Sequence, residues 1–297
     1  MRETRLNKID ILTIIIILIT IIVTVGGVLS FDTGRSYEVI NQYGDSVRIF
    51  GSGIYSHDSY FKAPVQIGSD FTILVIAVPL LIAALINEIR VRSNKTKLSL
   101  LSMLSVILYY ALSLAAGATY NSFHLLYIAL FSCSLFAVFA LAGNIDKKKI
   151  RDGQQWRLPS KGISAFLILS GIALVAAWMP DIITSLATGS SLALIEVYTT
   201  EITYVLDMGI IGPLCLICLH LLNKKDGLGD VLLAIILKIC IIIAVMMIPQ
   251  TIYQYLSGAV LVWGAVITKA GSFVVLGCFA AYFNRKLYTG MRISEKH

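Results

Sequence analysis

The feature that most constrains this chain is a series of eight apolar runs, each long enough to cross a lipid bilayer. A membrane-spanning helix needs about 20 predominantly apolar residues. The runs cover residues 11–29, 71–89, 98–116, 124–142, 163–179, 202–222, 231–248 and a stretch within 256–283. We therefore predict an all-α fold, a polytopic transmembrane helical bundle with eight spans, in which residues 1–297 form a single integral membrane domain.

The composition excludes a soluble fold. Hydrophobic residues make up 57% of the chain and charged residues only 14%, whereas about a quarter of the residues in a soluble domain are charged. The sequence also lacks the nucleophile-elbow, Walker and dinucleotide-binding motifs of soluble enzymes. We therefore expect no self-contained enzyme of the soluble type, and we predict no cofactor.

Lysine and arginine are concentrated in every second connection between the runs. The basic connections contain Arg2, Arg5, Lys8, Arg90, Arg92, Lys95, Lys97, Lys147, Lys148, Lys149, Arg151, Arg157, Lys161, Lys224, Lys225, Arg285, Lys286, Arg292 and Lys296. The other connections contain only Arg35, Arg48 and Lys62. Because basic loops stay in the cytoplasm, we predict a multi-pass protein of the plasma (inner) membrane of a prokaryote, with both termini cytoplasmic.

The net charge of +7 is likewise explained by the basic loops that orient the chain in the membrane. The basic residues form short clusters between apolar runs, and they do not line a groove or an arginine-rich helix. The expected partner is therefore the lipid bilayer, and we expect no binding of nucleic acid. We interpret the first run as an uncleaved span, because it is long for a signal peptide and no A-x-A site follows it.

Two polar segments are expected on the outer side. Residues 31–70 contain five glycines with β-type residues between them, which predicts a small extracytoplasmic cap with a hairpin. This cap is a candidate surface for a membrane-protein partner. Residues 181–200 have an apolar centre that could lie in the interface or re-enter the membrane. Trp178 and Tyr198 fall near the outer boundary, where an aromatic belt is expected.

The sixth run carries the strongest functional signal. Glu201, Tyr204 and Asp207 are followed by Gly209 and then by Pro213. A carboxylate about two turns inside the apolar boundary costs several kcal/mol unless it is paired, protonated or hydrated. The proline lacks an N–H and frees a carbonyl one turn earlier. An acid beside a broken helix favours a substrate, cation or proton site; the alternative is a kinked packing helix whose aspartate bonds to a tyrosine or lysine.

Two intramembrane lysines are candidate partners for this acid. By depth, Lys269 in the eighth run matches Asp207 better than Lys238 does, because Lys238 can extend to the cytoplasmic interface. Glycines recur in the sixth and eighth runs, which favours close approach of these two spans. We therefore include Lys269 among the candidate binding residues.

A second group of candidates faces the outer side. His57, Asp58 and His124 are weak candidates for a metal site, since they come from separate segments and no metal-binding spacing such as H-E-x-x-H is present. We expect hydrogen bonding or helix capping for these residues and predict no metal. Asp70 and Asp181 are interpreted as helix caps.

Several stretches resemble a group of uncharacterised bacterial and archaeal multi-span membrane proteins. These stretches are residues 53–60 (GIYSHDSY), 68–70 (GSD) ahead of Pro79, 120–127 (YNSFHLLY) and 198–213 (YTTEITYVLDMGIIGP). The resemblance would cover most of the chain. It implies a multi-span membrane protein and brings no activity with it.

Three functions fit these patterns. The first is transport or carriage of a small solute, ion or lipid through the sixth and eighth runs. The second is a non-catalytic membrane subunit or sensor that binds a partner through the cap. The third is a membrane-embedded enzyme that acts on a lipid-linked substrate with His57, His124 and Glu201. The first is the leading hypothesis, and an enzyme is less expected than a non-enzyme.

Overall fold

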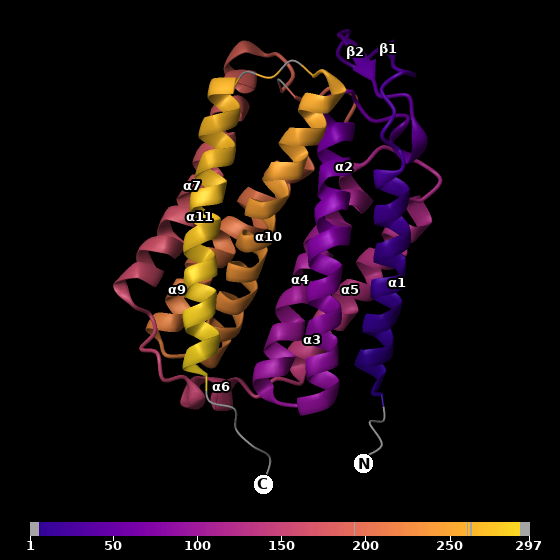
Figure 1. Ribbon diagram of the computed structural model, residues 1–297. Helices are drawn as coiled ribbons and strands as arrows, with labels where there is room; N and C mark the ends of the chain where they lie inside the picture. Colours follow the sequence, from indigo (N-terminus) through magenta and orange to yellow (C-terminus); the bar gives the residue numbers. More distant parts are fainter. Residues whose placement is uncertain (1–5, 193, 260, 262, 292–297) are drawn as a thin grey trace.

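The computed structural model describes residues 6–192, 194–259, 261 and 263–291, without the side chains of residues 263, 265, 266 and 269. Most of the described chain is helical (Figure 1). The helices are α1 (Lys8–Val28), α2 (Lys62–Thr72), α3 (Val78–Val91), α4 (Asn94–Gly117), α5 (His124–Gly143), α6 (Lys147–Gly153), α7 (Lys161–Thr188), α8 (Ile202–Leu206), α9 (Gly212–Asn223), α10 (Gly227–Ser257) and α11 (Trp263–Gly290).

Within the described residues, seven helices are long and apolar enough to cross a membrane. Two of them are composite, because α2 continues into α3 and α8 into α9. Large apolar side chains such as Leu18, Phe136 and Phe139 are exposed on their outer faces, which suits helices surrounded by lipid rather than water. The chain is a multi-pass membrane protein with an all-α architecture.

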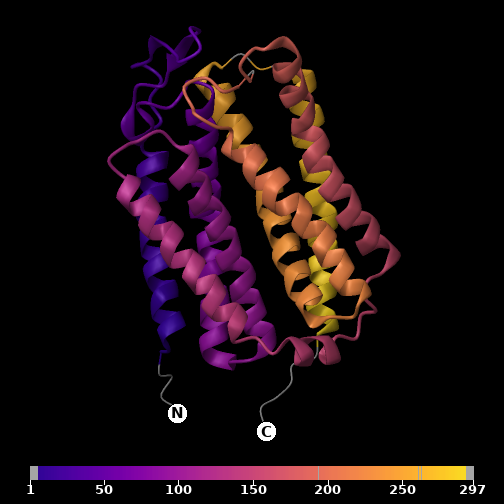
Figure 2. The same cartoon turned by 180° about the vertical axis from the view of Figure 1, so that it is seen from behind.

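The long helices form two groups of four that share one pattern of packing, when α2 with α3 and α8 with α9 are each counted as one helix. In the first group α1 packs on α2, α3 on α4, and α4 on α5; in the second group α7 packs on α9, α9 on α10, and α10 on α11. Contacts of α1 with α5 and of α7 with α11 close the two groups. Figures 1 and 2 show the groups side by side, with α1–α5 in indigo to magenta and α7–α11 in salmon to yellow.

The second member of each group is an interrupted helix. A π-helical turn, Ile73–Ala77 (η2), separates α2 from α3, and a second one, Asp207–Ile211 (η3), separates α8 from α9. Each turn is followed two residues later by a proline, Pro79 or Pro213, in the first turn of the next helix. Proline lacks an N–H donor and pushes the preceding turn open, and π-helical turns are frequent at functional sites.

Helices α10 and α4 join the two groups. Helix α10 packs on α2 and α4, and α4 also packs on α8. Gly68 of α2 allows a close approach to α10, because a Cβ atom there would lie 2.5 Å from the Cα atom of Gln250. Helix α4 is the most buried span, with Leu98, Leu100 and Leu104 fully enclosed, and it therefore forms the centre of the molecule.

The segment between α1 and α2 contains the expected hairpin. Strands β1 (Tyr37–Ile40) and β2 (Ser46–Ile49) pair antiparallel, with Tyr37 opposite Ile49. The side chains of Asn41 and Gln42 donate to the carbonyl oxygens of Glu196 and Tyr198, at 2.9 Å each. The hairpin therefore contacts residues 196 and 198, which lie between α7 and α8.

Several predicted boundaries are wrong. Residues 62–70 belong to helix α2 and not to the polar cap segment, because their polar face packs on protein rather than on lipid. Helix α7 continues to Thr188, so Asp181 lies inside a helix and is not a cap. Asp70 is likewise inside α2.

The expected approach of the sixth and eighth spans also differs from the observed packing. Gly277 of α11 lies against Ala244 of α10, and Gly212 of α9 lies against Gly171 of α7. The glycines therefore bring together helices that are neighbours within one group. The sixth span packs between α7, α10 and α4 instead.

Candidate functional site

Asp207 lies at the start of the π-helical turn η3 and is 3% exposed. The Tyr109 hydroxyl of α4 donates to one carboxylate oxygen at 3.0 Å, and Nε1 of Trp178 in α7 donates to the other, also at 3.0 Å. A tyrosine partner agrees with the alternative interpretation, a kinked packing helix, whereas the tryptophan was expected in an aromatic belt. Trp178 is instead buried, and its ring stacks on Tyr204 with centroids 4.7 Å apart.

Asp70 occupies the comparable place in the first group, just ahead of the π-helical turn η2, and is fully buried. The Tyr55 hydroxyl donates to Oδ2 at 2.6 Å, and the Tyr110 hydroxyl of α4 donates to Oδ1. Gly27 of α1 provides the space for this carboxylate, since a Cβ atom there would lie 1.6 Å from Oδ2. The interpretation of Asp70 as a cap is therefore wrong.

The two aspartates are connected through adjacent residues of one helix. Tyr109 and Tyr110 follow each other on α4, and their side chains diverge by about 100° around the helix axis. One hydroxyl reaches the interrupted span of the second group and the other reaches that of the first group. Helix α4 thus contacts both buried carboxylates, so a shift or rotation of α4 would alter both sets of hydrogen bonds.

A layer of polar contacts lies on the hairpin side of these aspartates. Lys62 at the start of α2 forms an ion pair with Glu201, the residue that precedes α8, and their side chains are 16% and 8% exposed. Ser59 donates to Glu196. The Lys62–Glu201 ion pair is mostly shielded from water. Charges in such a shielded environment interact more strongly than charges at a surface. These contacts hold together the segments at the start of α2 and ahead of α8.

Asp58 is the buried centre of the same layer. Its carboxylate accepts hydrogen bonds from the backbone N–H and the hydroxyl of Thr119, at 3.1 and 2.8 Å, and from the Tyr198 hydroxyl at 2.9 Å. Burial raises the pKa of Asp58 to about 6, although these hydrogen bonds oppose the shift. Burial also raises the pKa of Glu196.

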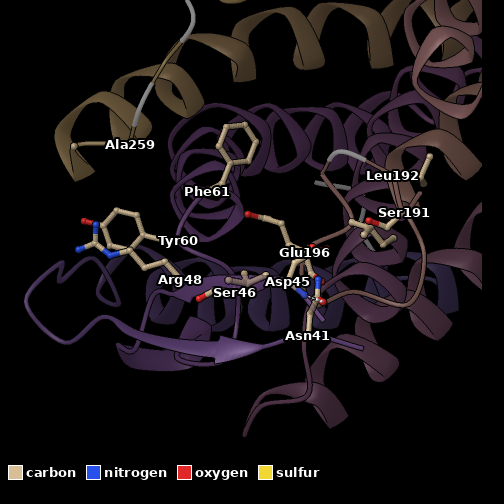
Figure 3. Close-up of a pocket in the computed structure, with 13 residues that line it drawn as sticks. Asn41, Asp45, Ser46, Arg48, Tyr60, Phe61, Ser191, Leu192, Glu196 and Ala259 are labelled. Carbon is tan, nitrogen blue, oxygen red and sulfur yellow. Dashed lines mark hydrogen bonds between the residues drawn. The ribbon is translucent and has the colours of Figure 1, made fainter. Parts of the chain in front are cut away.

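A cavity of about 520 Å³ opens above this layer. In Figure 3, Arg48 and Tyr60 lie on one side of it, Ser191 and Leu192 on the other, and Glu196 projects between them. The Arg48 guanidinium sits 3.8 Å from the centroid of the Tyr60 ring. Residues of the hairpin and residues 191, 192, 195 and 196 therefore form a polar vestibule at the hairpin end of the junction between the two groups.

The structure brings together part of the predicted site. Glu201, Tyr204 and Asp207 lie along one interrupted span, but Glu201 binds Lys62 and Tyr204 donates to Asp181 at 2.6 Å. No described atom lies within 4 Å of a Cβ placed at Gly209, and Pro213 follows the break as expected. The side chain of Lys269 is outside the described residues, and its proposed pairing with Asp207 stays a prediction.

The weak metal candidates are separated. The Nδ1 atom of His57 lies 3.4 Å from the Tyr37 hydroxyl, Asp58 bonds to Thr119, and the His124 ring packs against Tyr120. Among the residues that the structure describes, no three His, Cys, Asp or Glu side chains gather closely enough to hold a metal ion.

Sequence reasoning missed the first aspartate and three of the donors. Asp70, Tyr109, Tyr110 and Trp178 stand out only when the helices are packed. The available signal was an acid ahead of a proline at two of the apolar runs: Asp70 immediately before the run that contains Pro79, and Asp207 in the run that contains Pro213.

No family model matches the chain, and no curated protein or solved structure is significantly similar to it. The resemblance to uncharacterised multi-span proteins therefore stays a prediction.

Proposed function

We propose that the protein is a membrane carrier of a small solute or ion, built from two four-span halves. In this proposal α11 is the eighth span, both termini are cytoplasmic, and the protein resides in the plasma membrane of a prokaryote. The basic residues near the ends of α3, α9 and α11 support this orientation. The hairpin and the loop after α7 are then the extracytoplasmic cap.

The observation that carries the proposal is the pair of interrupted spans. Each half has a π-helical turn followed by a proline in its second span, with a buried aspartate beside the turn. In secondary transporters, interrupted helices in corresponding positions of two repeats form the substrate and ion sites near the middle of the membrane. If these residues served only to shape and pack the helices, neither a second buried aspartate nor a second interrupted helix would be needed.

The chemistry of these positions favours a proton or a cation as the coupling species. A charged carboxylate in a membrane interior is costly, and neutralising Asp70 or Asp207 removes that cost. Because Tyr109 and Tyr110 donate to the two acids from one helix, neutralisation of one acid would bias the position of α4 and hence the hydrogen bonds of the other. The conformation with the Lys62–Glu201 ion pair formed is then the one closed to the outside.

Transient currents on a solid-supported membrane test the proposal even before the substrate is identified. Liposomes containing the purified protein are perfused with pools of amino acids, sugars, organic acids and nucleosides, and with steps of Na⁺, K⁺ or pH. We expect a current, matched by flux of the labelled solute, for at least one condition. The Asp70→Asn, Asp207→Asn and Lys269→Met variants should lose it, whereas Asp152→Asn, an exposed acid in α6, should keep it.

Two outcomes would overturn the carrier proposal. One is the absence of any current or flux above protein-free liposomes under every condition. The other is wild-type flux in both the Asp70→Asn and Asp207→Asn variants. Insertion of each variant is checked by its yield and its elution profile in detergent.

The orientation has a separate test. Single cysteines placed at Asp45 in the hairpin connection and at Lys148 in α6, both exposed, are treated in intact cells with a membrane-impermeant maleimide. Labelling of the cysteine at position 45 and not of that at position 148 is expected. The reverse pattern would contradict cytoplasmic termini. The parent protein gives the background from its own five cysteines.

A second candidate function is a partner-binding subunit or sensor. Ile40 and Tyr43 of the hairpin are 69% and 52% exposed, and exposed apolar groups on an otherwise polar segment favour a protein contact. Retention of a specific membrane protein by the wild type and its loss after Ile40→Ser and Tyr43→Ser would support this function. Purification of the chain alone from gently solubilised membranes would count against it.

A further inference from the structure

A second cavity lies at the opposite end of the molecule from the hairpin. It has a volume of about 330 Å³ and is lined by residues of α4, α10 and α11, among them Lys95, Lys238, Asn284, Arg285 and Tyr288. These are the helix ends at the bottom of Figure 1. The cavity therefore sits at the end rich in lysine and arginine, where the first group of helices meets the second.

Three cations line this cavity, and none has a carboxylate partner among the described residues. Elsewhere at this end, the buried carboxylates of Asp10 and Asp230 each form an ion pair with an arginine. In the part of the chain that the structure describes, neither Lys95, Lys238 nor Arg285 takes part in an ion pair, and Lys95 donates to a backbone carbonyl at 3.3 Å. The cavity is thus a concentration of uncompensated positive charge.

The unpaired positive charge is costly at Lys238, because this side chain is partly buried. It lies eleven residues after Gly227, where α10 begins, which places its Cα atom about 16 Å along the helix. Its side chain is partly buried, and its ammonium lies 6.0 Å from the centroid of the Tyr288 ring. A cation at this depth requires water or an anion to offset its loss of hydration. The cavity provides space for an anion beside it.

The neutral groups of the cavity also suit an oxygen-rich ligand. The Oδ1 atom of Asn284 is buried and has no hydrogen-bond partner among the described residues. Because the oxygen and nitrogen of such an amide are assigned by their partners, the amide can turn its N–H groups toward a ligand. The Tyr288 hydroxyl lies 3.4 Å from the Ser102 hydroxyl and lines the same space.

We propose that this inner cavity is a binding site for a phosphate group, carried by an anionic phospholipid or by a soluble phosphate ester. Arginine and lysine bind phosphate through charge-assisted hydrogen bonds, and basic pockets between spans on the cytoplasmic side bind the headgroups of anionic lipids. Arg285 is exposed at the mouth of the cavity and Lys238 lies deeper. A phosphate oxygen can therefore bind Lys238 while Arg285 and Lys95 contact the remaining oxygens.

Thermal unfolding in nanodiscs tests the site and separates the two sources of phosphate. In one arm the nanodiscs contain phosphatidylcholine with increasing phosphatidylglycerol. In the other they contain phosphatidylcholine alone, and glycerol 1-phosphate or inorganic phosphate is added. We expect a saturable rise in melting temperature in one of the arms. Lys238→Gln and Arg285→Gln should each weaken the apparent affinity at least about tenfold.

A charge-matched control keeps the test specific. Lys148→Gln removes one positive charge from an exposed position in α6 outside the cavity, and it should leave the affinity within about twofold of the wild type. If Lys238→Gln fails to fold, Arg285→Gln still decides the outcome, because this side chain is exposed. A saturable effect in the lipid arm alone identifies a lipid headgroup, and one in the soluble arm identifies a phosphate ester.

The proposal is overturned if neither arm shows a saturable effect, or if the cavity variants behave like Lys148→Gln. Its outcome is independent of the carrier proposal, since the Asp70→Asn and Asp207→Asn variants leave the cavity unchanged and should bind the phosphate probe like the wild type. Loss of transport with intact phosphate binding, or the reverse, would show which of the two proposals fails.

Discussion

Tyr109 and Tyr110 are neighbours on α4, yet their hydroxyls bind carboxylates in different groups of helices, Asp207 and Asp70. A single helix at the centre of the bundle therefore contacts both interrupted spans. The hydrogen bonds of both acids therefore depend on the position of α4, although the two acids lie in different groups of helices. This relationship is the basis for treating them as one site.

Removal of either hydroxyl should destabilise the protein. In Tyr110→Phe the carboxylate of Asp70 loses one of its two tyrosine donors and keeps the hydrogen bond from Tyr55, and a buried polar group deprived of a partner costs about 1–3 kcal/mol. Tyr109→Phe should have a similar effect through Asp207. The free energy of unfolding in mixed detergent micelles measures both changes. Tyr120→Phe, at a residue that is 79% exposed, is the control, and equal stability of all three variants would refute the role of these hydrogen bonds.

Asp58 should make stability depend on pH. Because the folded-state pKa is raised from 3.8 to about 6, the folded protein binds this proton more tightly than the unfolded chain does. The contribution is fully present below about pH 4 and is lost as pH rises through 6, with a size of roughly 2–3 kcal/mol. Asp58→Asn should remove this part of the profile.

The measurement is the difference in melting temperature between wild type and Asp58→Asn at pH 4.5 and pH 7.5. Subtracting the melting temperature of the variant corrects for Glu196, whose pKa is raised as well, and for other groups that titrate in this range. The wild type should lose more stability than the variant between these pH values. A difference that does not change with pH would show that Asp58 is ionised throughout.

The Lys62–Glu201 ion pair gives a third prediction. Both side chains are largely buried, so Lys62→Met leaves the carboxylate of Glu201 without its counter-charge at a cost of about 3–5 kcal/mol. The double variant Lys62→Met with Glu201→Gln removes both charges and should be clearly more stable than Lys62→Met alone. Chemical denaturation of the wild type, both single variants and the double variant measures this coupling. Strictly additive effects would mean that the pair is not formed.

The all-α, multi-pass character of the chain was largely predictable, because apolar runs of about 20 residues leave few alternatives to a membrane helix. The start of α2 was not. Residues 62–70 contain Lys62, Pro64, Gly68 and Asp70, which look like loop and capping residues. They are helical because their polar side chains contact Glu201, Tyr55 and Tyr110 rather than lipid, and no local pattern records those distant partners.

The candidate site was predictable in the second group of helices only. Asp207 stood out because an acid followed by a proline inside an apolar run is unusual. Asp70 carries the same combination with Pro79, but its position near the end of a polar segment resembled a cap. Trp178 lay at the depth of an aromatic belt, and only packing of α7 on η3 turns its N–H toward Asp207. Residues on separate helices meet through tertiary packing, which periodicity in one sequence does not encode.

Packing of α10 on α11 gives a final prediction at a single pair of residues. A Cβ atom at Gly277 would lie 2.1 Å from the Cβ atom of Ala244, so Gly277→Ala must force the two helices apart. Overpacking of this kind costs about 1–3 kcal/mol. Adding Ala244→Gly moves the methyl group to the other helix and should restore most of the lost stability, less the cost of about 1 kcal/mol for a glycine in α10.

Gly271→Ala is the matched control, because no described atom lies within 4 Å of a Cβ atom at that position of α11. It should leave stability unchanged or raise it slightly through the helix propensity of alanine. Thermal unfolding of the wild type and of these variants in one detergent measures the comparison. If Gly277→Ala were as stable as Gly271→Ala, or if the Ala244→Gly change failed to restore the double variant, α10 and α11 would not pack through this glycine.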